Sequence, residues 1–460
     1  MNVTQIFLAS TLYGTATLAA ALDADLFPPA GRRILLTSNH SVTAEITPGL
    51  TAAPGFDALS TRFDAVLDWN AVIAPQHPST WSPRAEDVPL WERQLRASWD
   101  LGTDRVELIV ESLQVPPAQS LCRLFPGAAV EVYADGLMSY GPTRFRLDPL
   151  LGMRVRRVLH LDLVPGLEPL LLTEFGVRAE AIPSAAFLKV IGELDAAVDT
   201  PEIETLAPAA GSGSGSGSGS AAPALLLGQY LSALDLVPAA EEEELHVEMV
   251  RGAHALGHRE LVFKPHPSAP AAYSRRAEEE AERLGVRLTV LSTPVLAETL
   301  YERLRPALVV GCFSTGLLTA ATLYGLPVAR TGTGAVLARL SPYPNSNRIP
   351  LVLADALLPD LADPAAVRAW TPPGPERVAA ELAGLLTAVG FTMQPRILTE
   401  HRAEAERWLT AHLTTDTWRY FTRRRLTTLG LPGGIPAQLS FLPRSRAARR
   451  LARLLRRAVG

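Results

Sequence analysis

Three short groups of polar residues, each directly after an apolar run, could together do acid–base and phosphate chemistry. They are Ala134-Asp135-Gly136, Lys264-Pro265-His266-Pro267 and Ser314-Thr315-Gly316. A carboxylate such as that of Asp135 can accept the proton of an attacking hydroxyl group. Lysine and histidine side chains bind phosphate oxygens, and so do the hydroxyl and free N–H groups at the start of a helix. This combination predicts transfer of a phosphate-activated group to a hydroxyl acceptor.

Each group also has an ordinary structural interpretation when it is taken alone. An Asp-Gly pair is common in turns, a His between prolines fits a loop, and a Ser-Thr pair suits the N-terminal cap of a helix. His266 and Ser314, however, follow strands of one predicted sheet, and the carboxyl ends of parallel strands meet along one edge. We therefore expect these two residues at one crevice, with Asp135 facing them from the other half of the chain.

The elements that position these groups alternate between apolar strands and helices, which predicts parallel sheets covered by helices on both faces. We expect strands at 4–10, 33–38, 65–69, 105–111 and 129–133 in the first half, and at 224–228, 260–263, 286–291 and 307–311 in the second. Helices are predicted over 273–284, 294–303 and 317–324. The acidic run 241–244 is interpreted as the solvated face of another helix.

Gly-Ser repeats over residues 211–220 interrupt this pattern between the two halves. A segment of this composition cannot bury apolar surface, so it predicts a flexible coil and a boundary between domains. The length of 460 residues also favours two or three domains rather than one core.

Composition narrows the class of protein further. The sequence has no apolar run of 18 residues and a net charge of −4, so we expect a cytoplasmic protein that neither spans a membrane nor has general affinity for nucleic acid. Its N-terminus lacks the basic start of a secretory signal. Cys122 and Cys312 are too few for a disulfide framework and lack metal-ligand spacing, so no metal site is predicted.

The residues after Leu386 become helical and basic. Seven arginines stand between Arg444 and Arg457, with leucines on a narrower stripe. Such a pattern is typical of a helix that rests on an anionic membrane surface, which would make the protein peripheral on the inner face of the cell membrane. It is equally typical of a surface helix docked by its leucines, and both alternatives stay open.

The three polar groups resemble the motifs of the bacterial polysialyltransferase family of capsule-forming glycosyltransferases. Asp135-Gly136 resembles the family's acidic-acidic-Gly motif, His266-Pro267 its His-Pro motif, and Ser314-Thr315 its Ser/Thr motif. The resemblance runs from Thr11-Leu12-Tyr13-Gly14 to about residues 343–347. It implies an α/β fold of the GT-B type, in which two Rossmann-like domains face a central cleft, here with a C-terminal helical extension.

By the same resemblance, the enzyme would be an inverting, metal-independent sialyltransferase that uses CMP-activated sialic acid as donor, a glycan as acceptor and no cofactor. The implied catalytic residues are Asp135, as base, and His266, at the CMP phosphate; the implied substrate-binding residues are Gly14, Asn39, Gly136, Lys264, Pro267, Ser314 and Thr315. The expected domains are an N-terminal acceptor-side domain (1–208), a Gly/Ser-rich linker (209–222), a C-terminal nucleotide-sugar-binding domain (223–395) and a helical basic tail (396–460).

One departure from the family pattern matters. Ala134 stands at the first acidic position of the motif, so Asp135 remains as the base, or Glu131 on the same strand face serves as a displaced acid or as a partner. The departure keeps open a non-catalytic member of a surface-polysaccharide assembly complex. The phosphate-binding groups would also suit CDP-linked donors. Release of CMP from CMP-sialic acid separates the enzyme from the non-catalytic alternative.

Overall fold

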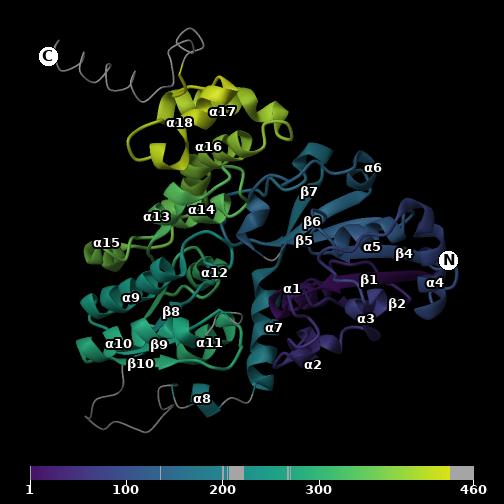
Figure 1. Ribbon diagram of the computed structural model, residues 1–460, viewed down its shortest axis with the longest axis horizontal. Helices are drawn as coiled ribbons and strands as arrows, with labels where there is room; N and C mark the ends of the chain where they lie inside the picture. Colours follow the sequence, from purple (N-terminus) through teal and green to yellow (C-terminus); the bar gives the residue numbers. More distant parts are fainter. Residues whose placement is uncertain are drawn as a thin grey trace.

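The computed structural model describes residues 2–134, 136–198, 201–204, 206, 222–266, 269 and 271–435. Four features of the sequence therefore lie outside the described residues: Asp135, Pro267, the Gly-Ser repeats and the arginine-rich tail. The described chain forms two domains, each built on a parallel sheet, with a group of helices above the second (Figure 1).

A seven-stranded parallel sheet forms the first domain. Its strand order, β3-β2-β1-β4-β5-β6-β7, is the doubly wound Rossmann order with one strand added. The strands are β1 (Val3–Ala9), β2 (Arg32–Thr37), β3 (Ala65–Asp68), β4 (Arg105–Val110), β5 (Ala129–Ala134), β6 (Val155–Leu161) and β7 (Arg178–Ile182).

Alternation along the central strands divides the first domain into two layers of helices. Phe7 packs in one hydrophobic cluster and its neighbours Ile6 and Leu8 in the other, because successive strand residues point to opposite faces. The Phe7 face is covered by α1 (Leu12–Asp23), α2 (Phe56–Ser60) and α7 (Ser184–Ala197); the opposite face is covered by α3 (Trp69–Ile73), α4 (Val88–Ser98) and α5 (Ala118–Leu124). The short α6 (Pro149–Gly152) precedes β6.

The second domain repeats this plan with five parallel strands in the order β10-β9-β8-β11-β12. They are β8 (Ala224–Leu227), β9 (Glu260–Lys264), β10 (Arg287–Val290), β11 (Leu308–Gly311) and β12 (Val328–Arg330). The helices of this domain are α9 (Ala239–Ala255), α10 (Arg275–Leu284), α11 (Ala297–Leu304), α12 (Thr315–Leu323), α13 (Thr333–Arg339), α14 (Arg348–Leu357) and α15 (Pro364–Ala369). The short α8 (Pro201–Glu204) belongs to the segment between the domains.

The last helices, α16 (Pro375–Met393), α17 (Arg402–His412) and α18 (Arg423–Leu429), lie above the second domain in Figure 1. At the end of α16 the Gln394 side chain donates to the Arg144 carbonyl of the first domain at 2.7 Å. On the other side, Arg419 pairs with the buried carboxylate of Asp355 in α14 at 2.8 Å. The helical extension therefore joins the two domains.

The predicted fold class is confirmed, and the predicted strands recur within two residues of their expected ends. Three strands, β6, β7 and β12, were not predicted. The interpretation of the acidic run is wrong for Glu242, which is completely buried and accepts hydrogen bonds from the backbone N–H groups of Leu231 at 2.6 Å and Ser232 at 2.9 Å. No helix in the described part of the chain combines the length and apolarity needed to cross a membrane.

Candidate active site

The loop after β5 and the start of α12 meet between the two domains. A Cβ atom added at Gly136 would lie 3.1 Å from the Thr315 Oγ1 atom. Further along α12, the Thr322 hydroxyl donates to the Leu163 carbonyl of the first domain at 2.9 Å. The acidic motif and the Ser/Thr motif, which are far apart in sequence, are therefore neighbours in space.

The start of α12 is a turn in which only glycine fits at the third position of the motif. Ser314 is the N-terminal cap, and its Oγ atom accepts the N–H of Gly316 at 3.2 Å. The Tyr301 hydroxyl donates to the Gly316 carbonyl at 3.0 Å and would stand 2.8 Å from a Cβ at that residue. Thr315 is the first residue of the helix, so the positive end of the helix dipole lies beside two hydroxyl groups, which suits an anion.

The His-Pro motif follows β9, two strands away from β11 with β8 between them. Lys264 ends β9, and the His266 ring lies 6.5 Å from the ring of Tyr230 in the loop after β8. Gln229 in the same loop accepts the Phe313 N–H at 2.8 Å, immediately before the Ser314 cap. The loop after β8 thus connects the His-Pro and Ser/Thr motifs along one sheet edge.

Burial sets the protonation states of the basic groups at this edge. Burial lowers the pKa of His266, and the positive charge of Lys264 lowers it further. The His266 imidazole is therefore neutral near pH 7 and has one N–H to donate. Burial also lowers the pKa of the Lys264 amine, against the attraction of Glu298.

Glu298, on α11, is an acidic neighbour of Lys264 that the sequence did not single out. Its side chain is 3% exposed. Burial raises the pKa of this carboxyl to about 7, although the charge of Lys264 acts in the opposite direction. A buried acid with a pKa near neutrality beside a basic residue is typical of a functional site.

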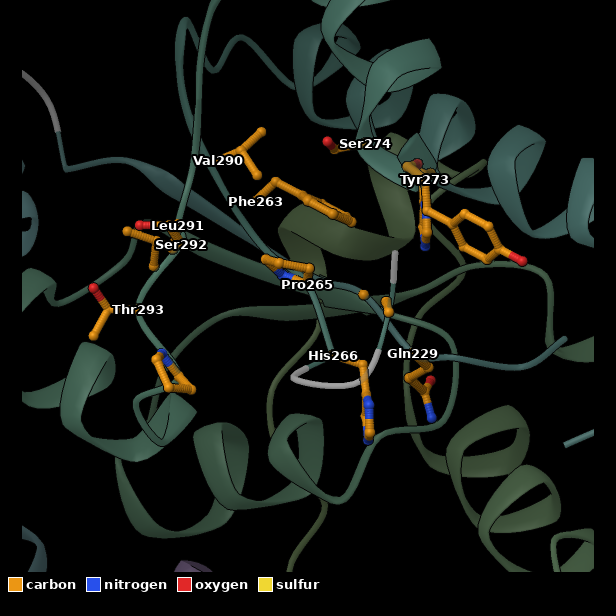
Figure 2. A pocket seen from close by; sticks show the side chains of 14 residues that line it. Gln229, Phe263, Pro265, His266, Tyr273, Ser274, Val290, Leu291, Ser292 and Thr293 are labelled. Carbon is orange, nitrogen blue, oxygen red and sulfur yellow. The ribbon is translucent and has the colours of Figure 1, made fainter. Parts of the chain in front are cut away.

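A cavity of about 380 Å³ opens at the carboxyl ends of β8, β9 and β10 (Figure 2). His266 and Gln229 line one part of it, and Ser292 and Thr293 lie across the cavity from Gln229. Aromatic and imidazole rings from Phe263, Tyr273 and His246 complete much of the remaining wall. This volume is within the range of about 300–1,000 Å³ that is usual for small-molecule sites.

The structure brings together four of the predicted site residues in two pairs, Gly136 with Thr315 and Lys264 with His266, and Ser314 caps the helix beside them. Asp135 and Pro267 lie outside the described residues, so their predicted roles stay predictions. Two other predicted residues belong to the first domain. The Gly14 N–H donates to the Thr11 hydroxyl that caps α1, at 2.9 Å.

Asn39 organises its own loop. Its side-chain amide donates to the Ala44 and Thr47 carbonyls at 3.3 and 2.9 Å. The alternative acid Glu131 is paired with Arg157 at 2.8 Å. It lies three residues before the end of β5, or about 10 Å along the strand, which leaves Glu131 inside the domain rather than at the sheet edge.

Several residues at or near the cavity were missed at the level of sequence. Gln229 and Tyr230 could have been found, because they follow an apolar strand as the recognised motifs do. His246 and Glu298 lie on helices and carry no local signal. Among the described residues, no three His, Cys, Asp or Glu side chains come close enough to hold a metal ion.

Two Rossmann-like domains whose parallel sheets present their carboxyl edges to the same group of motifs form the GT-B architecture. The family model described as "Alpha-2,8-polysialyltransferase (POLYST)" matches residues 5–333. The chain therefore belongs to the alpha-2,8-polysialyltransferase family and is a glycosyltransferase of the sialyltransferase type.

Solved structures show similarity at low identity. A mutant O-GlcNAc transferase from Thermobaculum terrenum is 14% identical with a TM-score of 0.36; the match covers 91% of this chain but only 65% of that one. A glycosyltransferase from Rickettsia africae is 10% identical (TM-score 0.39; 88% of this chain and 93% of that one). The GT-B domain of a sialyltransferase from Photobacterium damselae is 11% identical (TM-score 0.39; 77% and 96%). No curated protein matches the chain.

Proposed function

We propose that this enzyme transfers sialic acid from a CMP-activated donor to a hydroxyl group of a glycan acceptor, with inversion at the transferred carbon and without a metal ion or other cofactor. The observation that carries the proposal is the contact between Gly136 and Thr315. A Cβ atom added at Gly136 would lie 3.1 Å from the Thr315 Oγ1 atom. This contact joins the motif that contains the candidate base to the helix start that suits a phosphate.

The second domain offers the groups that a cytidine monophosphate donor requires. The cavity can hold a base and ribose, and its mouth carries His266, whose neutral ring can donate one N–H to a phosphate oxygen. The hydroxyl groups at the start of α12 can donate to the same phosphate, and the positive end of the helix dipole favours its charge. Lys264 adds a basic group behind His266.

The proposed reaction combines these groups with Asp135, the base predicted from its motif. Asp135 takes the proton of the acceptor hydroxyl as its oxygen bonds to the anomeric carbon of the donor, and the bond from that carbon to the CMP phosphate breaks. Negative charge then develops on the leaving phosphate. His266 and the helix start stabilise this charge through hydrogen bonds, which supports a reaction that does not depend on a metal ion. Attack from the face opposite the leaving group inverts the configuration.

A cytoplasmic location against the inner face of the cell membrane, and a surface or capsule polysaccharide as product, also belong to the proposal. The arginines between Arg444 and Arg457 support the membrane contact through their charge, and they lie outside the described residues. Sedimentation of the full chain with phosphatidylglycerol vesicles at low salt, compared with a chain truncated after Pro443, tests this part alone.

Calorimetry with CMP tests the donor assignment. The wild-type protein should bind CMP and release it from CMP-sialic acid, with and without EDTA. His266→Ala should weaken CMP binding by about 1.5–3 kcal/mol, the worth of a hydrogen bond to a charged group. His412→Ala is the control, because His412 is exposed on α17. Equal CMP affinity in the wild type and His266→Ala would refute the role of His266. Turnover of a CDP-linked donor instead of CMP-sialic acid would favour the other donor class.

A further inference from the structure

His246 on α9 is a buried polar residue of the cavity wall that the proposed reaction does not use. Its side chain is 3% exposed, and its ring packs edge-on against Phe263 at 4.9 Å between ring centres. The Nδ1 atom lies 3.3 Å from the Tyr273 carbonyl oxygen. The Nε2 atom is buried and has no hydrogen-bond partner among the described residues.

The contact at Nδ1 determines the hydrogen-bonding character of Nε2. A carbonyl oxygen can only accept, so Nδ1 carries the proton and donates to Tyr273. Burial lowers the pKa of His246, against the opposing charges of Glu242 and Glu243 on the same helix, so the ring stays neutral. Nε2 is then a hydrogen-bond acceptor without a donor. Leaving a buried acceptor unsatisfied is unfavourable, and a ligand in the cavity can satisfy it.

We infer that His246 determines which nucleotide base the enzyme accepts, because its Nε2 atom accepts a hydrogen bond from the exocyclic amino group of cytosine. Cytosine carries this amino group where a uracil-type base carries a carbonyl oxygen, which is an acceptor. With a uridine nucleotide, the carbonyl oxygen of the base and the Nε2 atom of His246 would face each other, and both are acceptors. The inference rests on the proposed function, since it places the base of the donor in this cavity.

The residues around His246 hold its Nε2 atom in one position. The imidazole is held on one side by the Tyr273 backbone and on another by the Phe263 ring. Tyr273 is itself held through its hydroxyl, 3.1 Å from the Ser232 hydroxyl. A base that presents an acceptor therefore cannot be accommodated by a simple rotation of His246, and discrimination between donors follows.

Calorimetric titration of the full chain with CMP and with UMP tests this inference. We expect the wild type to bind CMP about ten- to a hundredfold more tightly than UMP, the effect of leaving a buried polar group unpaired. His246→Phe keeps the ring and removes the acceptor, so it should weaken CMP binding and bring the CMP/UMP ratio close to one. His246→Gln provides a second variant, whose amide can accept or donate and should also remove the preference.

The control is His254→Gln, about two turns further along α9, because His254 does not line the cavity. It should retain the wild-type preference. A wild-type protein that binds both nucleotides equally, or a His246 variant that keeps the preference, overturns the inference and leaves sialic acid transfer standing. A wild-type protein that binds neither nucleotide and does not hydrolyse CMP-sialic acid overturns the proposed function itself.

Discussion

Gly136 and Thr315 belong to different domains, yet a Cβ atom on Gly136 would lie only 3.1 Å from the Thr315 Oγ1 atom. The backbone of Gly136 is extended, with φ of −155° and ψ of −178°, a conformation open to any residue. The glycine is therefore required for close approach between the domains and not for an unusual backbone angle. A substitution at Gly136 therefore tests the contact with Thr315 without adding backbone strain.

Gly136→Ala should lower turnover by about tenfold and change the thermal unfolding temperature little, because a displacement of a few tenths of an ångström misplaces the reacting groups without disturbing either core. Steady-state kinetics and a thermal melt check this expectation. The control is Gly127→Ala, since a Cβ there meets nothing within 4 Å. Unchanged turnover in Gly136→Ala would show that the two motifs need not approach during the reaction.

Asp135→Asn should lower turnover by about two to four orders of magnitude and leave CMP affinity nearly unchanged, because the amide keeps the size of the carboxylate but cannot take the proton. Single-turnover kinetics combined with calorimetry measures both quantities. Glu131→Gln is the comparison variant, and it should retain turnover, since Glu131 is committed to Arg157 at 2.8 Å. The opposite ranking of the two variants would move the role of base to Glu131.

The sequence predicts best what depends on local pattern. The apolar runs of β1 and β5 are buried on both faces and were found, whereas β7 is exposed along most of its length and β6 contains two arginines, so neither has a continuous apolar run. The motifs after β5, β9 and β11 were predictable because the carboxyl ends of parallel strands converge. That rule also places the loop after β8 beside them.

Residues supplied by helices were not predictable in the same way. Glu242 and His246 lie one helical turn apart on α9 and are both buried, although the acidic run around Glu242 has the composition of a solvated face. Packing of α9 against β8 and β11 decides which of its sides is buried. Composition gives the average polarity of a helix but not which of its faces is turned toward the core. The burial of Glu242, His246 and Glu298 could therefore be learned only from the structure.

Glu202 fixes one wall of the cavity from the segment between the domains (Figure 1). Its carboxylate accepts the Ser292 N–H at 2.9 Å, the Ser292 hydroxyl at 3.0 Å and the Thr293 hydroxyl at 2.8 Å. Both Glu202→Gln and Thr293→Val should weaken CMP binding by about three- to tenfold, the loss of one or two hydrogen bonds.

A double-mutant cycle tests whether Glu202 and Thr293 affect CMP binding through their shared hydrogen bond or independently of each other. The combination of Glu202→Gln with Thr293→Val should bind CMP no more weakly than the weaker single variant, because both changes remove the same contact. Glu193→Gln on α7 is the control, since Glu193 pairs with Arg62 at 2.6 Å and not with the cavity. Multiplying losses in the double variant would mean that Glu202 and Thr293 act separately.

Glu298 should make the stability of the protein fall as pH rises through the weakly acidic range. Burial raises the pKa of this carboxyl from 4.5 to about 7, so between these values the unfolded chain has released a proton that the folded chain keeps. Stabilisation by the neutral carboxyl is therefore complete below pH 4.5, is lost progressively up to pH 7, and is gone above it.

Glu298→Gln removes this titration while it keeps the size of the side chain. The stability of the variant relative to the wild type should therefore increase between pH 4.5 and 7 by about 3 kcal/mol and stay constant at higher pH, as the shift in pKa requires. Urea unfolding at a series of pH values measures this difference. Glu302→Gln, at an exposed position one helical turn further along α11, is the control. A parallel pH dependence in Glu298→Gln and the wild type would show that Glu298 is ionised inside the folded protein and forms a charged pair with Lys264.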